Sequence, residues 1–282
     1  MSGMRGYLGF AAFTAALAGL SGLAFAGSGL PEPWETGFQD AATPTMEKLV
    51  SLHSLVLYII LAVAAFVFIL LAIVAVRFNA KANPTPTKTT HNTLLEMIWS
   101  GVPVIILVVI AIPSFKLLYF ADRTPEPELT VKAIGHQWYW SYEYPDSGIL
   151  FDSFMIEDDS LEEGQPRLLA TDSHVVVPID TNVQLLTTAD DVIHSWAVPA
   201  FGVKLDAVPG RINETWFRVE EEGMYYGQCS ELCGVNHGFM PIAVEAVSKE
   251  KFAEWLDWAQ EEYAHNSPAE PVGLAAAQAA QH

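Results

Sequence analysis

The sequence has few positive charges and few cysteines for its length. Its 282 residues include 14 Lys and Arg against 33 Asp and Glu, which gives a formal net charge of −19. A chain this acidic repels nucleic acid, so we exclude nucleic-acid binding. Two cysteines, Cys229 and Cys233, are too few for a disulfide framework. Charged residues make up 17% of the chain, below the value of about 25% that is typical of soluble domains, which argues against an ordinary cytosolic enzyme.

The scarcity of charge leaves two long uncharged runs. Residues 54–76 and 97–115 contain no Asp, Glu, Lys or Arg. Each run is long enough to cross the ~30 Å hydrocarbon layer of a membrane as a helix. We therefore predict a transmembrane helical hairpin over residues 49–121, with spans at about 54–76 and 97–118.

The distribution of charge predicts the orientation of this hairpin. The loop between the spans carries Arg77, Lys81 and Lys88 but only one acid, Glu96. Enrichment of Lys and Arg marks a cytoplasmic loop, so we expect both ends of the chain on the outer side. Residues 122–282 contain 28 of the 33 acidic side chains. The part that follows the hairpin is therefore expected to be an acidic outer domain.

The two ends of the chain have their own compositions. Residues 1–26 are typical of a secretory signal peptide, with Arg5 before an apolar stretch and an Ala-x-Ala cleavage site at 24–26. A first membrane helix is the alternative for this segment. Residues 27–48 form an outer lead-in to the hairpin. Residues 265–282 are rich in Ala and Gln, and we expect them to be a disordered tail.

Residues 122–264 have the pattern of a β domain followed by one helix. Short β-branched or aromatic runs alternate with turn residues, which is typical of an all-β sandwich or barrel. Ser248 is a suitable N-cap for a helix over 249–263. The expected strands are 129–134, 137–144, 175–179, 183–188, 193–198, 215–219, 224–228 and 241–247.

One glycine-rich segment concentrates possible metal ligands. It contains Cys229, Cys233, His237 and Met240, and a remote His194 stands in a predicted strand. Thiolate, thioether and imidazole ligands together favour copper. A disulfide between the two cysteines and a structural zinc site of two Cys and two His are alternatives. The residues by themselves predict a soft-metal site and leave the choice open.

Four motifs in order resemble subunit II of the haem–copper cytochrome c oxidases. Residues 229–240 are similar to the binuclear copper (CuA) motif of that family. Residues 135–144, with the sequence GHQWYWSYEY, resemble its aromatic segment. Residues 191–196 (DVIHSW) and 206–211 (DAVPGR) resemble two further signatures. Four motifs in one order rarely agree by chance, and the likeness covers about residues 45–255.

The resemblance implies a fold, a function and a setting. The implied fold class is mixed membrane and all-β: a two-helix transmembrane hairpin followed by a cupredoxin-like Greek-key β-barrel or sandwich. The CuA centre would accept electrons from cytochrome c and pass them to haem a in subunit I, where oxygen is reduced to water with proton pumping. A membrane-anchored copper or zinc protein without oxidase activity is the alternative. The implied partners are oxidase subunits I and III, cytochrome c and lipid, in a bacterial inner membrane with both termini in the periplasm; haems belong only to the partner. The implied copper ligands are His194, Cys229, Cys233, His237, Met240 and the backbone carbonyl of Glu231.

The resemblance also implies roles outside the copper ligands. Trp138 would be the point at which electrons arrive. Strand alternation places residues 138, 140, 142 and 144 on one face, and a packed aromatic core is the alternative for this segment. An exposed Trp138 then requires either a bulge between it and Trp140 or edge exposure of one of the two. Glu96 would form the cytoplasmic entrance of a proton pathway, with a helix-start charge favoured by the dipole as the alternative. The side chain of Glu231 would bind magnesium at the interface with subunit I. Cytochrome c is usually basic around its haem edge, so we expect acids near Trp138 to attract it. These docking acids are Glu143, Asp152, Asp172 and Asp191.

Overall fold

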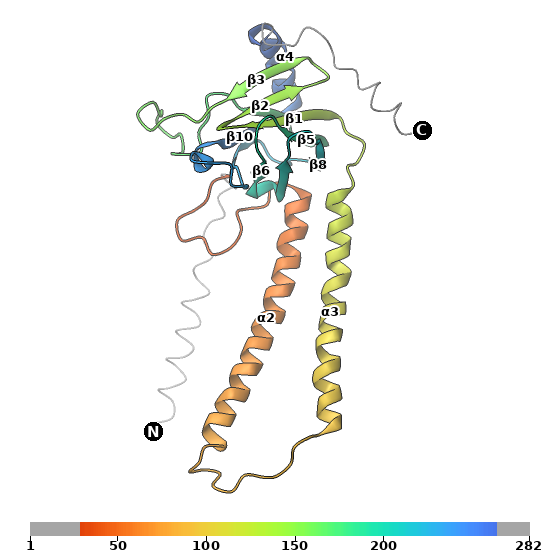
Figure 1. The fold of residues 1–282 in the computed structure, drawn as a ribbon. Helices are drawn as coiled ribbons and strands as arrows, with labels where there is room; N and C mark the ends of the chain where they lie inside the picture. Colours follow the sequence, from red (N-terminus) through yellow and green to blue (C-terminus); the bar gives the residue numbers. More distant parts are fainter. Residues whose placement is uncertain (1–28, 264–282) are drawn as a thin grey trace, which may run out of the picture.

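The computed structural model describes residues 29–263, which form two long helices with a β domain above them (Figure 1). The predicted signal peptide, residues 1–26, and the predicted tail, residues 265–282, lie outside the described residues. The helices are α2 (Pro44–Arg77), α3 (Thr93–Asp122) and α4 (Lys249–Glu262), with short 3-10 turns η1 (Pro199–Phe201) and η2 (His237–Phe239). The strands are β1 (Leu129–His136), β2 (Tyr139–Tyr144), β3 (Ile149–Ser153), β4 (Val175–Pro178), β5 (Val183–Ala189), β6 (His194–Val198), β7 (Val203–Ala207), β8 (Asn213–Phe217), β9 (Gly223–Gln228) and β10 (Pro241–Val247).

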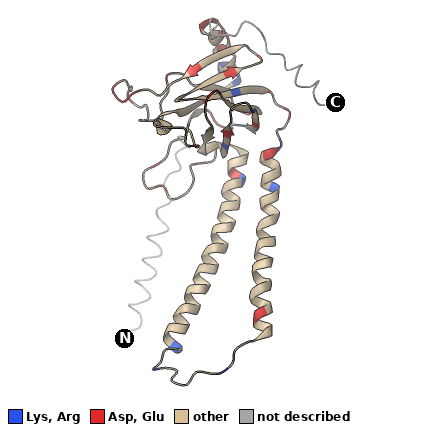
Figure 2. Ribbon diagram, in the orientation of Figure 1, with Lys and Arg blue, Asp and Glu red and all other residues tan. Residues whose placement is uncertain are grey.

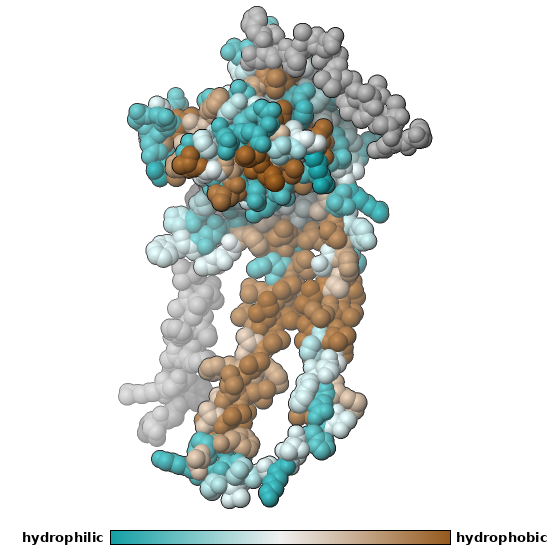
Figure 3. All heavy atoms as spheres, viewed as in Figure 1, coloured by the Kyte–Doolittle hydropathy of each residue, from teal (hydrophilic) through white to brown (hydrophobic). Residues whose placement is uncertain are grey.

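Helices α2 and α3 are long and apolar enough to cross a membrane, and the predicted spans 54–76 and 97–118 lie within them. The most apolar stretch of each helix has no residue buried among the described parts of the chain. Charged residues occur only near the helix ends (Figure 2), and the surface between these ends is almost wholly hydrophobic (Figure 3). The two helices lie closest at the domain end and separate toward the connecting loop (Figure 1). Such a large apolar surface needs lipid or another protein around it.

The β domain is joined to both helices at their outer ends. The Thr43 hydroxyl caps α2 by accepting from the Met46 N–H at 3.1 Å, and it donates to the carbonyl of Phe201 at 2.7 Å. The Trp216 indole N–H donates to the carbonyl of Phe120, near the end of α3, at 3.2 Å. The rings of Phe120 and Trp216 also meet edge to face, with centroids 5.4 Å apart. These contacts hold the domain directly above the hairpin.

The domain is a β-sandwich, as the fold class predicted. Its larger sheet has the order β3-β2-β1-β5-β8, and the smaller sheet has the order β4-β10-β9. Strands β6 and β7 form a separate antiparallel pair. Each of the eight expected strands corresponds to an observed one, with ends that differ by a few residues; β3 and β7 were not expected. The core between the sheets is aromatic, with Trp140, Tyr142, Tyr144 and Trp196 fully buried.

The predicted strand 137–144 is wrong in its first two residues. Strand β1 ends at His136, β2 begins at Tyr139, and the residues between them form the hairpin turn. Trp138 therefore lies half-buried in a turn, whereas Trp140 is fully buried in the core. A turn, and not a bulge or edge exposure, separates the two indoles, while the expected aromatic core is present at residues 140, 142 and 144. The turn was not expected because its two residues, Gln-Trp, lack the Gly, Asn or Asp that usually marks such a turn.

Candidate metal centre

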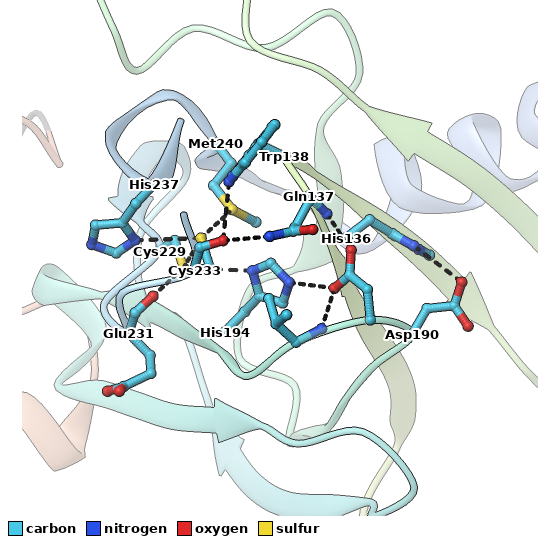
Figure 4. A network of polar contacts seen from close by, with 12 residues as sticks. His136, Gln137, Trp138, Asp190, His194, Cys229, Glu231, Cys233, His237 and Met240 are labelled. Atoms are coloured by element: carbon cyan, nitrogen blue, oxygen red, sulfur yellow. Dashed lines mark hydrogen bonds and ion pairs between the residues drawn. The ribbon is translucent and has the colours of Figure 1, made fainter. Parts of the chain in front are cut away.

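The possible ligands come from strand β6 and from the loop between β9 and β10 (Figure 4). His194 is the first residue of β6. The loop continues the β9–β10 ladder by one bond, from the Cys229 N–H to the carbonyl of Met240 at 3.4 Å. It is tied to β6 by a bond from the Ser230 N–H to the carbonyl of Ser195 at 3.0 Å. Strand pairing therefore places the two halves of the site side by side.

The donor atoms form a compact chain with the two sulfurs in the middle. The Cys229 sulfur lies 3.9 Å from the His194 Nδ1 and 3.9 Å from the Cys233 sulfur. The Cys233 sulfur lies 3.5 Å from both the His237 Nδ1 and the Met240 Sδ. The carbonyl oxygen of Glu231 is 3.4 Å from the Cys229 sulfur. Ligands bound to one metal ion at about 2.0–2.3 Å are separated by distances of this kind, so the donor set fits a soft metal.

Both cysteines are free and buried, and their thiols differ in acidity. Burial opposes ionisation of Cys229, but hydrogen bonds involving His194 and the backbone outweigh it and lower its pKa to about 7. Burial and the neighbouring Cys229 sulfur raise the pKa of Cys233 to about 12. Without a cation, the pair therefore holds one negative charge readily and a second one only with difficulty. A bound cation would be needed to keep both as thiolates, and binding would release protons.

Asp191 fixes the orientation of His194. One carboxylate oxygen lies 2.9 Å from the His194 Nε2 and accepts from the Val192 N–H at 2.6 Å. The other accepts from the Gln137 N–H at 2.7 Å. Although partial burial raises it, the pKa of Asp191 is held below its usual value by the hydrogen bonds with His194, Val192 and Gln137. An Nε2 proton directed at Asp191 leaves Nδ1 free to bind a metal beside Cys229.

The β1–β2 turn packs directly on the metal-binding loop. The Trp138 indole N–H donates to the carbonyl of Cys233 at 3.2 Å, and the Gln137 side-chain amide donates to the same oxygen at 2.7 Å. Gly234 follows in a left-handed conformation, φ 125°, and a Cβ there would lie 2.9 Å from the indole ring. The sequence singled out Trp138 only by resemblance and gave no reason to single out Gln137.

Two more close contacts hold the site together. A Cβ on Gly135 would lie 2.7 Å from the ring of His194, so the histidine packs against the bare backbone of β1. The Trp140 indole N–H donates to the carbonyl of Met240 at 3.3 Å. Sequence reasoning did not find Gly135, because the sequence contains no signal that pairs it with residue 194.

The expected docking acids fall into two groups. Asp152, Asp172 and Asp191 lie around a surface stack in which Tyr139 contacts His136 and Phe154, each at a centroid distance of 4.5 Å. Asp152 accepts from the Ser141 hydroxyl, which also contacts His136, and Asp172 accepts from the Phe154 N–H. Asp190, which was not predicted, lies 3.8 Å from His136. Glu143 instead forms an ion pair with Lys132 at 2.8 Å.

The two glutamates with expected roles lie in different places. The carbonyl of Glu231 points toward the sulfurs, while its exposed carboxylate points away from them (Figure 4). Glu96 lies in the first turn of α3, where its carboxylate accepts from the Asn92 N–H at 3.3 Å. This is the end of α3 farthest from the β domain, so the structure does not bring Glu96 to the metal site.

Known proteins resemble both parts of the chain. The family profiles "Cytochrome C oxidase subunit II, transmembrane domain" and "Cytochrome C oxidase subunit II, periplasmic domain" match residues 31–117 and 129–247. A probable cytochrome c oxidase subunit 2 of Rickettsia bellii is 55% identical over 234 residues, covering 83% of this chain and 87% of that protein. Cytochrome c oxidase subunit 2 of Zea mays is 51% identical over 232 residues, covering 80% and 89%. The crystal structure of the periplasmic domain of subunit II of Bradyrhizobium japonicum cytochrome oxidase is 52% identical, with a TM-score of 0.47, and covers 50% of this chain and 99% of that chain.

Proposed function

Since the chain belongs to the family of subunit II of cytochrome c oxidase, we propose that its β domain holds the binuclear CuA centre through which electrons enter the oxidase. With copper bound by the Cys, His and Met side chains of this domain, the site would supply one-electron transfer from cytochrome c to haem a in subunit I. Oxygen reduction to water and the coupled proton pumping take place in that partner. The two helices match the family's transmembrane domain, so the chain is a two-pass membrane protein.

The observation that carries this proposal is the order of the donor atoms. Two cysteine sulfurs lie at the centre, and each has one imidazole nitrogen within 3.9 Å. Two thiolates in this order can bridge two metal ions, and each imidazole can then bind one of them. The Met240 thioether and the Glu231 carbonyl are further, weak donors. With copper bound, the site would supply a one-electron redox centre with soft, copper-selective ligands.

The residues around the donors limit movement and exclude water. His194, Cys229, Cys233 and Met240 are buried, so solvent has little access to their donor atoms. Asp191 holds His194 through its Nε2, and Gln137 and Trp138 hold the carbonyl of Cys233. A centre whose ligands are fixed from outside reorganises little when its charge changes, which favours fast electron transfer.

The two sides of the site would serve different partners. Figure 4 draws Trp138 and the carboxylate of Glu231 on opposite sides of the sulfurs. Trp138 is half-buried beside the acidic, aromatic surface, which supports docking of a basic cytochrome c there. The Glu231 side would face subunit I, where one exposed carboxylate with water suits magnesium.

The membrane setting completes the proposal. Arg77 ends α2, and the loop that follows carries Lys81 and Lys88 and no acid. This charge distribution supports a cytoplasmic loop and periplasmic termini in a bacterial inner membrane. Glu96 would then lie at the cytoplasmic surface, at the entrance of a proton pathway that continues in subunit I. Its position in the first turn of α3 agrees with this role.

Copper stoichiometry and electron paramagnetic resonance of the purified full-length chain test the central claim. We expect two coppers per chain and, in the oxidised state, a spectrum with coupling to two equivalent copper nuclei. One copper with coupling to a single nucleus, or zinc in place of copper, would instead support a membrane-anchored metal protein without oxidase function.

A further inference from the structure

A groove lies between α2 and α3 at the end nearest the β domain. Each helix contributes four residues at the spacing i, i+3, i+4 and i+7, which places them on one helical face. The groove has a volume of about 610 Å³, within the ~300–1,000 Å³ range of small-molecule sites. Its walls are Lys48, Ser51, Leu52 and Leu55 of α2, and Pro113, Lys116, Leu117 and Phe120 of α3.

The groove changes from charged to apolar along the membrane normal. Lys48 lies nearest the domain on α2 and Leu55 deepest, about 10 Å apart at 1.5 Å per residue. On α3, Lys116 directly follows the uncharged run 97–115, so it lies at the edge of the hydrocarbon layer. Leu55 and Pro113 line the part below the two lysines. This order matches a phospholipid, whose charged head lies above its acyl chains.

The two ammonium groups lack acidic partners. Neither Lys48 nor Lys116 takes part in an ion pair with any residue between 29 and 263. The Lys48 ammonium instead lies 4.6 Å from the ring centroid of Phe120, across the groove on α3. The neighbouring Glu47 lines a different hollow, beside Phe38 and His53. In a chain with a net charge of −19, this leaves a local positive site at the depth of lipid headgroups.

We propose that this groove binds one anionic phospholipid of the outer leaflet. Its phosphate lies between the ammonium groups of Lys48 and Lys116, and one acyl chain runs down between Leu55 and Pro113. Each lysine near a membrane surface favours anionic lipid, so two lysines predict that the groove prefers an anionic over a zwitterionic lipid roughly tenfold or more. The bound lipid would hold the outer ends of the hairpin together beneath the domain.

The test is photolabelling of the intact oxidase complex. The complex is reconstituted in phosphatidylcholine vesicles with a trace of phosphatidylglycerol that carries a diazirine on its acyl chain, and the labelled peptides are mapped by mass spectrometry. We expect label on residues 51–55 and 113–117. Unlabelled phosphatidylglycerol should displace this label roughly tenfold better than phosphatidylcholine does, and glycerol phosphate, which has no chain, should not displace it.

Matched variants separate the groove from general lipid contact. The double variant Lys48→Gln with Lys116→Gln should abolish the preference for phosphatidylglycerol over phosphatidylcholine. The control, Lys81→Gln with Lys88→Gln, removes the same charge from the loop and should keep this preference. Leu55→Trp keeps both lysines but fills the apolar part of the groove, so it should remove the label. This variant serves as the test if the lysine double variant does not assemble. Assembly is checked by copper content.

Three results would overturn the proposal. Absence of label from both helix segments would mean that a partner subunit fills the groove. Equal displacement by the two lipids would mean non-specific contact at the protein surface. Unchanged preference in the Lys48 and Lys116 double variant would mean that the lysines do not bind the headgroup.

Discussion

The indole nitrogen of Trp138 donates a hydrogen bond to the carbonyl oxygen of Cys233 at 3.2 Å. The two residues are 95 positions apart in the sequence, and the turn that carries Trp138 lies against the loop that carries both cysteines. The bond links a half-buried aromatic ring directly to the backbone of a proposed copper ligand. It therefore gives the proposed electron path a defined first step.

Trp138→Phe should slow electron transfer while leaving docking intact. Phenylalanine keeps an aromatic ring in the turn but removes the N–H that contacts Cys233. We expect the rate of copper reduction by cytochrome c, measured by stopped-flow absorbance, to fall roughly tenfold or more with KM nearly unchanged. Trp258→Phe, at an exposed position on α4, is the control and should behave as wild type. A Trp138 variant whose KM alone changed would indicate a docking role instead.

The two cysteines should be far more sensitive than Met240. Cys229→Ser or Cys233→Ser removes one of the two thiolates that we propose to bridge the coppers, so the proposed two-copper centre and its near-infrared absorption should disappear. Met240→Leu removes only a weak donor and preserves the packing volume, so we expect two coppers with a shifted spectrum or potential. Copper analysis with absorbance spectroscopy measures both effects. Native spectra in both serine variants would rule out the CuA assignment.

Gly135→Ala should disturb the metal centre although residue 135 binds no metal. Its Cβ would lie 2.7 Å from the His194 ring, whose Nε2 is held by Asp191 at 2.9 Å. The ring must move, so we expect reduced copper occupancy or an altered spectrum. Gly238→Ala lies in the metal-binding loop itself, but its Cβ would meet nothing within 4 Å. Equal effects of the two substitutions would show that the crowding of His194 is not the cause.

Neutralising Asp152 and Asp172 should weaken the attraction for cytochrome c. Both carboxylates lie at the exposed aromatic stack, and the hydrogen bonds that they accept come from uncharged donors. We expect the double Asn variant to raise KM and to flatten the salt dependence of kcat/KM, with little change in maximal rate. Glu143→Gln should have a smaller effect, because Lys132 already compensates this charge.

The control for this prediction is a pair of exposed acids on α4, Glu254→Gln with Asp257→Asn. At about 1 M salt the screening length is only ~3 Å, so the kcat/KM values of wild type and of the Asp152 and Asp172 double variant should become equal there. If kcat/KM fell as much in the α4 variant as in the Asp152 and Asp172 double variant, the attraction would come from the overall charge of the domain and not from a local patch. Asp191 is unsuitable for this test, since its neutralisation would also release His194.

Two substitutions of Glu96 separate a proton role from a structural one. Glu96 accepts a hydrogen bond from the Asn92 N–H, and Glu96→Gln keeps an acceptor there but cannot exchange a proton. If Glu96 admits protons, Glu96→Gln and Glu96→Ala should both slow turnover severalfold, with normal copper content and normal KM for cytochrome c. Oxygen consumption with excess donor measures the rate. Normal turnover in the Gln variant would leave only the helix-capping role.

The local features of the chain could be predicted from the sequence. The uncharged runs 54–76 and 97–115 indicated the two helices, because hydrophobic length is a property of a continuous segment. The grouping of Cys229, Cys233, His237 and Met240 indicated a metal-binding loop for the same reason. The residues favoured copper through the Met240 thioether but left zinc and a disulfide open, and the resemblance to a family made copper the prediction.

Contacts between distant segments depended on the tertiary structure. Alternation placed Trp138 on the strand face of Trp140, whereas the β1–β2 turn places it on the metal-binding loop. From the sequence Asp191 was singled out only as a docking acid, and the structure shows that it also orients His194 and accepts from Gln137. The groove between α2 and α3 depends on the return of the chain as an antiparallel helix, which brings two lysines of separate segments to the walls of one hollow. The sequence determines each segment's own periodicity, but packing decides which residues meet, because contacts across the sheets and helices join residues as far as 158 positions apart.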